Sequence, residues 1–163
     1  ALGKTVLISN YAEYHRLAQY LFQFTQRPIG IVMGVPTLRA VFDEQYYGDL
    51  QGGILEAFGR LFRNELRLLV YPELESATGS IVSATNLRVA PHLRHLHAYL
   101  VENRMIEGLR EYDPACLSIK SRDVLRLIQS GDPTWEPMVP PAVAAMIKDR
   151  RLLGYKPADE RAA

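Results

Sequence analysis

Three short apolar runs lie in the first half of the chain. They are residues 4–10 (KTVLISN), 28–34 (PIGIVMG) and 65–72 (ELRLLVYP), and the second is bounded by Pro28 and Gly34. Bounded runs of this length, rich in Val, Ile and Leu, are typical of strands that are buried on both faces of a parallel sheet. We therefore predict three strands that lie side by side and point the same way.

The segments between these runs have the apolar spacing of helices. One helix is predicted after Asn10, which serves as its N-cap, and a second after Thr37, also as N-cap. A third is predicted between Gly53 and Asn64. Strand–helix–strand units of this length form right-handed crossovers. We therefore expect an α/β fold, with a Rossmann-like parallel sheet (βαβαβ core) and helices on both faces.

The second half of the chain is predicted to be mostly helical. Residues 73–85, rich in Ser, Thr, Gly and Ala, are expected to form an exposed loop, and a helix is expected at Pro91. A short fourth strand is predicted at residues 106–112. The C-terminal segment is expected to be helical, with one helix capped by Ser121 or by Ser118 and another that begins at Pro141.

Length and composition indicate a single domain. The chain has 163 residues, of which 48% are apolar and 23% charged, as is ordinary for a globular protein. We expect one α/β domain over residues 1–155 and a flexible tail over residues 156–163. The first residues, ALGKTV, include no initiator Met. This is expected of the C-terminal piece of a longer protein.

Charge, hydropathy and cysteine content indicate which binding partners and which cellular compartment to expect. The net charge of +1 gives no electrostatic case for nucleic acid, and the sequence has no apolar run long enough to span a membrane. The single cysteine, Cys116, excludes an internal disulfide and fits a reducing compartment. We therefore expect a cytoplasmic protein that binds neither membrane nor nucleic acid.

The predicted sheet nominates a ligand site at the carboxyl ends of its strands, where open α/β sheets bind ligands. The residues selected there for binding are Ser9, Asn10, Gly34, Thr37 and Arg39, with Tyr71 and Glu73 at the end of the third run. Their polar groups and the positive ends of the adjoining helices suit a phosphate. The alternative is that they only cap helices and form turns. Neither a G-x-G-x-x-G fingerprint nor a P-loop occurs, so the usual dinucleotide-binding mode is not supported.

The segment PHLRHLH contains His92, His95 and His97, the densest group of candidate metal ligands or bases. His92 and His95 are three residues apart on one helix face, which makes them secondary candidates for sharing a metal ion. The favoured interpretation is a solvated helix start, and an anion site with Arg88 and Arg94 is another. No catalytic residue is assigned, because a Ser/His/Asp triad has no nucleophile-elbow sequence to support it.

The last quarter of the chain has a recognisable pattern. A serine opens a helix (Ser121), a glycine follows that helix (Gly131), and a VPxxV segment begins at Val139. In these features residues 118–155 resemble the C-terminal end of the nicotinate and nicotinamide mononucleotide adenylyltransferases, of the nucleotidylyltransferase superfamily. The chain departs from that family at Leu125, where the family has an ATP-binding arginine, and it lacks the family's N-terminal HxGH signature.

This resemblance implies that Ser121, Arg122 and Arg126 line the phosphate side of a bound nucleotide, either ATP or an NAD-related nucleotide. The implied function is a nucleotide- or phosphometabolite-binding domain related to these enzymes of NAD metabolism, without a complete catalytic apparatus of its own. Any catalysis is expected to be nucleotidyl transfer, which depends on positioning and on stabilising phosphate charge.

Two further hypotheses belong to other functional classes. One is a non-catalytic α/β domain that joins subunits, or joins this chain to a preceding domain. Apolar helices around residues 58–62 and around Tyr46 and Tyr47 are expected to supply its contact surface. The other is a metal-dependent enzyme built on the three histidines.

Overall fold

The computed structural model describes residue 5, residues 7–75 and residues 78–157. The chain forms two compact units, a first unit that ends at Glu111 and a second unit that starts at Tyr112. The single domain expected over residues 1–155 stays a prediction, and most of the tail expected over residues 156–163 lies outside the described residues.

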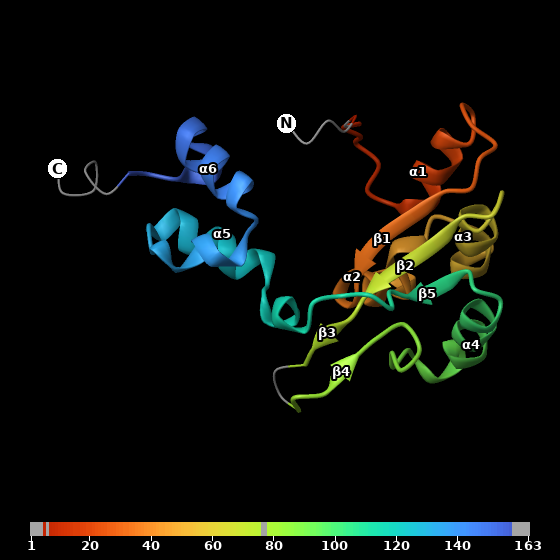
Figure 1. The fold of residues 1–163 in the computed structure, drawn as a ribbon. Helices are drawn as coiled ribbons and strands as arrows, with labels where there is room; N and C mark the ends of the chain where they lie inside the picture. The colour runs from red at the N-terminus through yellow and green to blue at the C-terminus, as the bar shows by residue number, and fades with distance from the viewer. Residues whose placement is uncertain (1–4, 6, 76–77, 158–163) are drawn as a thin grey trace. The chain divides into compact units, whose positions relative to one another are not determined.

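The first unit is built on a small parallel sheet (Figure 1). Its strands are β1 (Gly30–Gly34), β2 (Arg67–Tyr71) and β5 (Ile106–Gly108), in the order β1-β2-β5. The register pairs Gly34 with Tyr71 and Leu68 with Ile106. An α/β fold with parallel strands is therefore confirmed, and so are the strands predicted at residues 28–34, 65–72 and 106–112.

The strand predicted at residues 4–10 is wrong for the part of it that the structure describes. Residue 5 and residues 7–10 form no strand, and the side chains of Leu7 and Ile8 are 61% and 92% exposed. Lys4 and Val6 lie outside the described residues. An apolar run shows only that a segment is suited to a buried strand, because neighbouring strands and covering helices decide whether it becomes one.

The helices predicted in the first unit are present, but two of their caps are wrong. The helices of the first unit are α1 (Tyr14–Leu21), α2 (Val35–Val41), α3 (Gly53–Leu61) and α4 (Arg94–Glu102), with short 3₁₀ turns at Glu44–Tyr47 and Pro91–Leu93. The residue before α1 is Glu13 rather than Asn10. The helix α2 starts before Thr37, with Gly34 as N-cap, because Pro36 is already set for the first helical turn.

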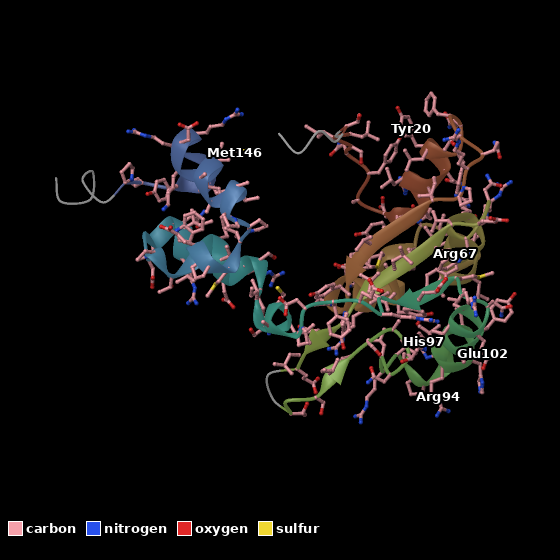
Figure 2. The ribbon with its side chains drawn as sticks, viewed as in Figure 1. Tyr20, Arg67, Arg94, His97, Glu102 and Met146 are labelled. Atoms are coloured by element: carbon pink, nitrogen blue, oxygen red, sulfur yellow. The ribbon has the colours of Figure 1, made fainter. Side chains whose placement is uncertain are left out.

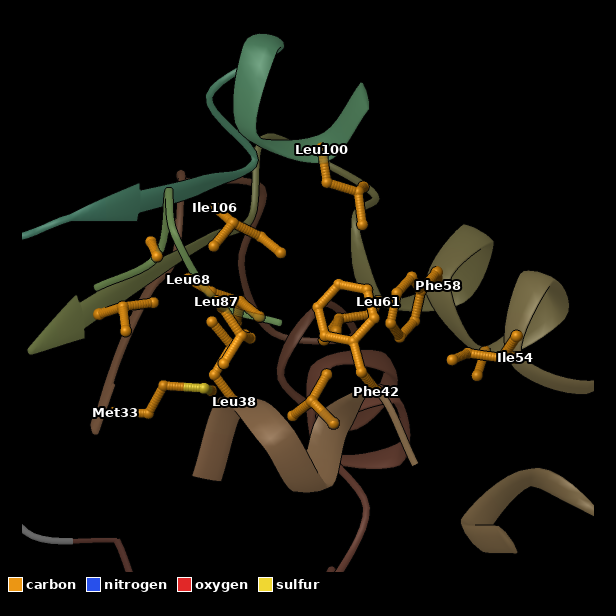
Figure 3. Close-up of a cluster of buried hydrophobic side chains, with 14 of the residues drawn as sticks. Met33, Leu38, Phe42, Ile54, Phe58, Leu61, Leu68, Leu87, Leu100 and Ile106 are labelled. Atoms are coloured by element: carbon orange, nitrogen blue, oxygen red, sulfur yellow. The ribbon is translucent and has the colours of Figure 1, made fainter. Parts of the chain in front are cut away.

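The core of the first unit lies on one face of the sheet (Figure 3). Buried side chains from the strands pack there against buried side chains from the helices. They include Met33, Leu68, Val70 and Ile106 from the strands, and Leu38, Phe42, Phe58, Leu61 and Leu100 from the helices.

The opposite face of the sheet is open over β1, where Val32 is 64% exposed. The strands follow one another in chain order, so right-handed crossovers place every connecting helix on the same side. Helices were predicted on both faces of the sheet, but the connecting helices all lie on one face.

Residues 73–82, predicted to be an exposed loop, include a small antiparallel hairpin. Its strands are β3 (Glu73–Leu74) and β4 (Ile81–Val82), and Glu73 pairs with Val82. The hairpin begins two residues after β2 ends, so it stands directly at the carboxyl end of the central strand.

The second unit is helical, as predicted for the C-terminal segment. It contains α5 (Ser121–Ser130) and α6 (Pro141–Arg150), with 3₁₀ turns at Pro114–Ser118, Pro133–Met138 and Leu152–Gly154. Its separate core contains Trp135, which is 1% exposed and contacts the Tyr155 ring edge-on. The left-handed φ of 79° at Gly131 ends α5, the role predicted for that glycine. Among the described residues, no helix is long and apolar enough to cross a bilayer.

Candidate functional site

A groove opens near the carboxyl ends of the parallel strands, between α2 and the hairpin. Strand β1 leads directly into α2, and β2 leads through Pro72 into β3. The groove has a volume of about 450 Å³, within the range of small-molecule sites. We call it the hairpin groove, and its described lining residues are Arg39, Glu75, Thr78, Ser80, Ile81, Val82, Asn86 and Arg88.

Two of the polar side chains in the groove hold the hairpin in shape. The Asn86 amide donates to the Ile81 carbonyl at 2.9 Å, and its oxygen accepts from the Ser83 N–H at 2.7 Å. The Thr78 hydroxyl donates to Glu75 Oε2 at 2.8 Å and accepts from the Ser80 N–H at 3.2 Å. Because these bonds are internal, Asn86 and Thr78 have a structural role.

The two arginines of the groove are less constrained by internal bonds. The Arg39 guanidinium lies 4.0 Å from Glu75 Oε1, and these side chains are 49% and 40% exposed. Arg88 is exposed and has no ion-pair partner within the described part of the chain. Two arginines and one carboxylate give the described lining a net charge of +1. A planar guanidinium binds phosphate or carboxylate through paired hydrogen bonds, so the groove is suited to a small anion.

The structure brings some of the rim residues predicted from sequence to this place and not others. Gly34 ends β1, and Arg39 lines the groove. Thr37 lies inside α2 and is half-buried, so it is not the N-cap that was expected. Ser9 and Asn10 are exposed and end no strand, so the argument that placed them at the rim is wrong.

Arg88 and Glu75 are groove residues that sequence reasoning missed as members of this site. Both lie in or beside the segment that was expected to be an exposed loop. The available signal was the pair of short apolar segments, Leu74 and Ile81–Val82, on either side of a Thr-Gly-Ser turn. That pattern favours a hairpin, which places its flanking charges next to the end of β2.

The residues implied by the adenylyltransferase resemblance lie in the second unit. Ser121, Arg122 and Arg126 are exposed on α5. The N-cap position of that helix is Lys120, so the cap predicted at Ser121 or Ser118 is wrong. Arg126 Nη2 is 3.5 Å from Asp123 Oδ1. The described lining of the hairpin groove comes entirely from the first unit, so these three residues are not part of it.

The three histidines of the PHLRHLH segment lie in different environments. His92 Nε2 lies 2.6 Å from Glu44 Oε2 at the surface, and His95 is exposed. His97, labelled on α4 in Figure 2, is buried and its Nε2 lies 2.9 Å from the Ala84 carbonyl oxygen. Burial lowers the pKa of His97 below its ordinary value of 6.5, against the opposing effect of that hydrogen bond. In the parts of the chain that are described, no three His, Cys, Asp or Glu residues gather in a way that could hold a metal ion.

The contact surface expected for an oligomerisation domain is mostly core. Phe58 and Tyr47 are only 3% and 7% exposed, and the Tyr47 hydroxyl donates to the Val41 carbonyl at 2.8 Å. Of the aromatic residues in this group, Tyr46 is the exposed one, at 52%. The apolar spacing was correct for a helix, but it marks the face that packs inward.

Comparison with known proteins identifies no relative of this chain. No family model matches the chain, and neither the curated proteins nor the solved structures give a significant match. The chemistry of the groove itself therefore carries the functional argument.

Proposed function

We propose that this chain binds a small phosphorylated metabolite or nucleotide in the hairpin groove, through Arg39 and Arg88. The observation that carries the proposal is that Arg88, which has no ion-pair partner among the described residues, lines the same groove as a loosely paired Arg39, near the carboxyl ends of parallel strands. Hydrogen bonds to charged groups contribute about 1.5–3 kcal/mol each. Two guanidinium contacts are therefore enough to hold a phosphate in an open groove.

The proposal includes the fold relationship implied by the sequence. Three parallel strands in chain order, with helices on one side, correspond to one half of a Rossmann-like sheet. We infer that the chain is a diverged relative of the mononucleotide adenylyltransferases that has kept nucleotide binding. ATP, NAD and nicotinamide mononucleotide are the ligands to test first, and we expect no complete nucleotidyl transfer from this chain by itself.

Thermal unfolding in the presence of these three nucleotides and of inorganic phosphate tests the proposal. A ligand at 100 times its Kd stabilises the native state by about 2.7 kcal/mol, which raises the Tm by several degrees. We expect such a rise for at least one phosphorylated ligand, and its loss in Arg88→Ala. Arg27→Ala is the matched control, because Arg27 is an exposed arginine outside the hairpin groove. Failure of every phosphorylated ligand to raise the Tm would contradict the proposal.

A second candidate function, self-association, is favoured by the open face of the sheet. Val32 is 64% exposed there, and Leu69 on the neighbouring strand is only half-buried. The same face carries an ion pair, with Arg67 Nη1 at 3.1 Å from Glu107 Oε1, and these opposite charges allow a second copy to pair across a two-fold axis. Light scattering on a dilution series tests this. A dimer that Val32→Lys abolishes supports it, and a monomer at every concentration contradicts it.

A further inference from the structure

We propose that the hairpin groove selects phosphate monoesters that also carry hydroxyl groups, such as sugar phosphates, and that Glu75 is the residue that makes this selection. The inference rests on the proposed function of the groove and specifies its ligand class. Among the described lining residues, Glu75 is the single carboxylate.

The backbone and the side chain of Glu75 are held in place before any ligand arrives. Its N–H donates to the Ser80 carbonyl at 2.9 Å, and its carbonyl accepts from the Gly79 N–H at 2.9 Å. Its Oε2 accepts from the Thr78 hydroxyl at 2.8 Å. A group that is already ordered loses little conformational entropy on binding, so Glu75 is pre-organised as a ligand contact.

The other carboxylate oxygen of Glu75 keeps its capacity to accept. Oε1 lies 4.0 Å from Arg39 Nη2, which is an ion-pair distance but too long for a hydrogen bond. An ionised carboxylate only accepts hydrogen bonds, so it needs donors on the ligand. It also repels a bare phosphate through like charge. A ligand must therefore present an anion to the arginines and a donor to Glu75.

The nearby guanidinium decides which donor fits. A ligand ammonium at Glu75 Oε1 would lie close to the Arg39 cation, and the two positive charges would repel each other. A neutral hydroxyl has no such penalty. Carbon atoms of a sugar have an apolar surface to lie on, because Ile81 in the groove is 43% exposed. These groups together favour a polyol phosphate.

Calorimetric titration with two matched pairs of ligands tests the inference on the full chain. We expect ribose 5-phosphate to bind at least about tenfold more tightly than inorganic phosphate, as one charge-assisted hydrogen bond allows. We also expect glycerol 3-phosphate to bind more tightly than phosphoethanolamine. The reverse order in the second pair would show that Glu75 selects an ammonium, and would overturn the assignment to hydroxyls.

The Glu75→Gln variant separates this inference from the proposed function. Loss of the negative charge should make inorganic phosphate bind more tightly, and it should reduce the preference for ribose 5-phosphate over phosphate to less than about threefold. The matched control Glu102→Gln should keep the wild-type preference. If no phosphate compound binds the wild type, the proposed function fails. If ribose 5-phosphate and phosphate bind the wild type equally, only the selection by Glu75 fails. An unchanged Tm of Glu75→Gln without ligand confirms that the hairpin is intact.

Discussion

His15 is a buried titratable residue without a hydrogen-bond partner for either ring nitrogen among the described residues. It is 2% exposed on α1, and its ring centroid lies 6.0 Å from that of Tyr47. Burial, followed by the positive charge of Arg16, lowers the pKa of His15 below its ordinary value of 6.5. The nearby carboxylates of Glu13 and Asp49 oppose this shift without cancelling it.

This lowered pKa predicts a loss of stability in mild acid. Below pH 6.5 the unfolded chain binds a proton at this histidine while the folded chain does not, so stability falls as the pH decreases from 6.5 toward the folded pKa. Above pH 6.5 the histidine is neutral in both states and contributes no slope. We expect the Tm of the wild type to decrease between pH 7.5 and pH 5.5 more steeply than that of His15→Leu. The control is His95→Gln, at an exposed histidine, which should follow the wild type. If the Tm of the wild type and of His15→Leu decreased in parallel with pH, this would contradict the prediction.

At the level of single residues, the sequence predicted some roles and not others for a physical reason. Gly131 was predictable because a helix end with left-handed backbone strongly favours glycine. Thr37 and Asn10 were not, because many residues can cap a helix and the true start depends on where the strand before it ends. Arg39 was predictable from its position next to β1, whereas Arg88 required the hairpin to be known.

Leu68 is the apolar side chain at the centre of the sheet. It is completely buried on the middle strand, between Ile31 of β1 and Ile106 of β5 in the register. We predict that Leu68→Ala lowers the free energy of unfolding by about 2–5 kcal/mol, through lost burial and a residual cavity. Urea denaturation measures this, and Leu55→Ala, at a 65% exposed position on α3, should change it by less than about 0.5 kcal/mol. Equal effects of the two substitutions would contradict the packing described for the sheet.

At the level of elements, helices were easier to predict than strands. Helical periodicity comes from a residue's own neighbours along the chain, and α1, α3 and α4 each appear where it was found. A strand also needs a partner. Residues 4–10 have the longer apolar run in the sequence, Val6-Leu7-Ile8, but it is Ile106–Gly108 that pairs with β2. The helices lie on one side of the sheet because of the order of the strands, and a local sequence pattern does not reveal that order.

At the scale of the whole molecule, the described residues form two separate hydrophobic cores. That of the second unit is small and centres on Trp135, packed with Val124, Ile128, Ala144 and Ile147. Small cores give marginal stability, so the loss of one large side chain should matter more here than in the first unit.

We therefore predict that Trp135→Ala selectively unfolds the second unit, because truncating a buried tryptophan costs about 3–5 kcal/mol. Hydrogen exchange resolved by residue should show lost protection in α5 and α6 and retained protection in β1 and β2. Loss of protection to the same extent throughout the sheet would show instead that the two units unfold as one.

The proposed ligand site was harder to predict from the sequence than the fold. Strand ends pointed to the region of the first unit in which the hairpin groove lies, and the C-terminal resemblance pointed to phosphate chemistry on α5. The groove that unites Arg39, Glu75 and Arg88 depends on how the hairpin folds over the end of the sheet, and its residues are far apart in the sequence.

The measurement that tests the central claim most directly is the location of a bound phosphate monoester in the full chain. Titration of the ¹⁵N-labelled protein with ribose 5-phosphate reports the position through backbone amide shifts. We predict saturable shifts at Arg39, at Ser80 and at Arg88, and their absence in Arg88→Ala. Shifts confined to residues 121–126 on α5, or no shift at any ligand concentration, would contradict the account.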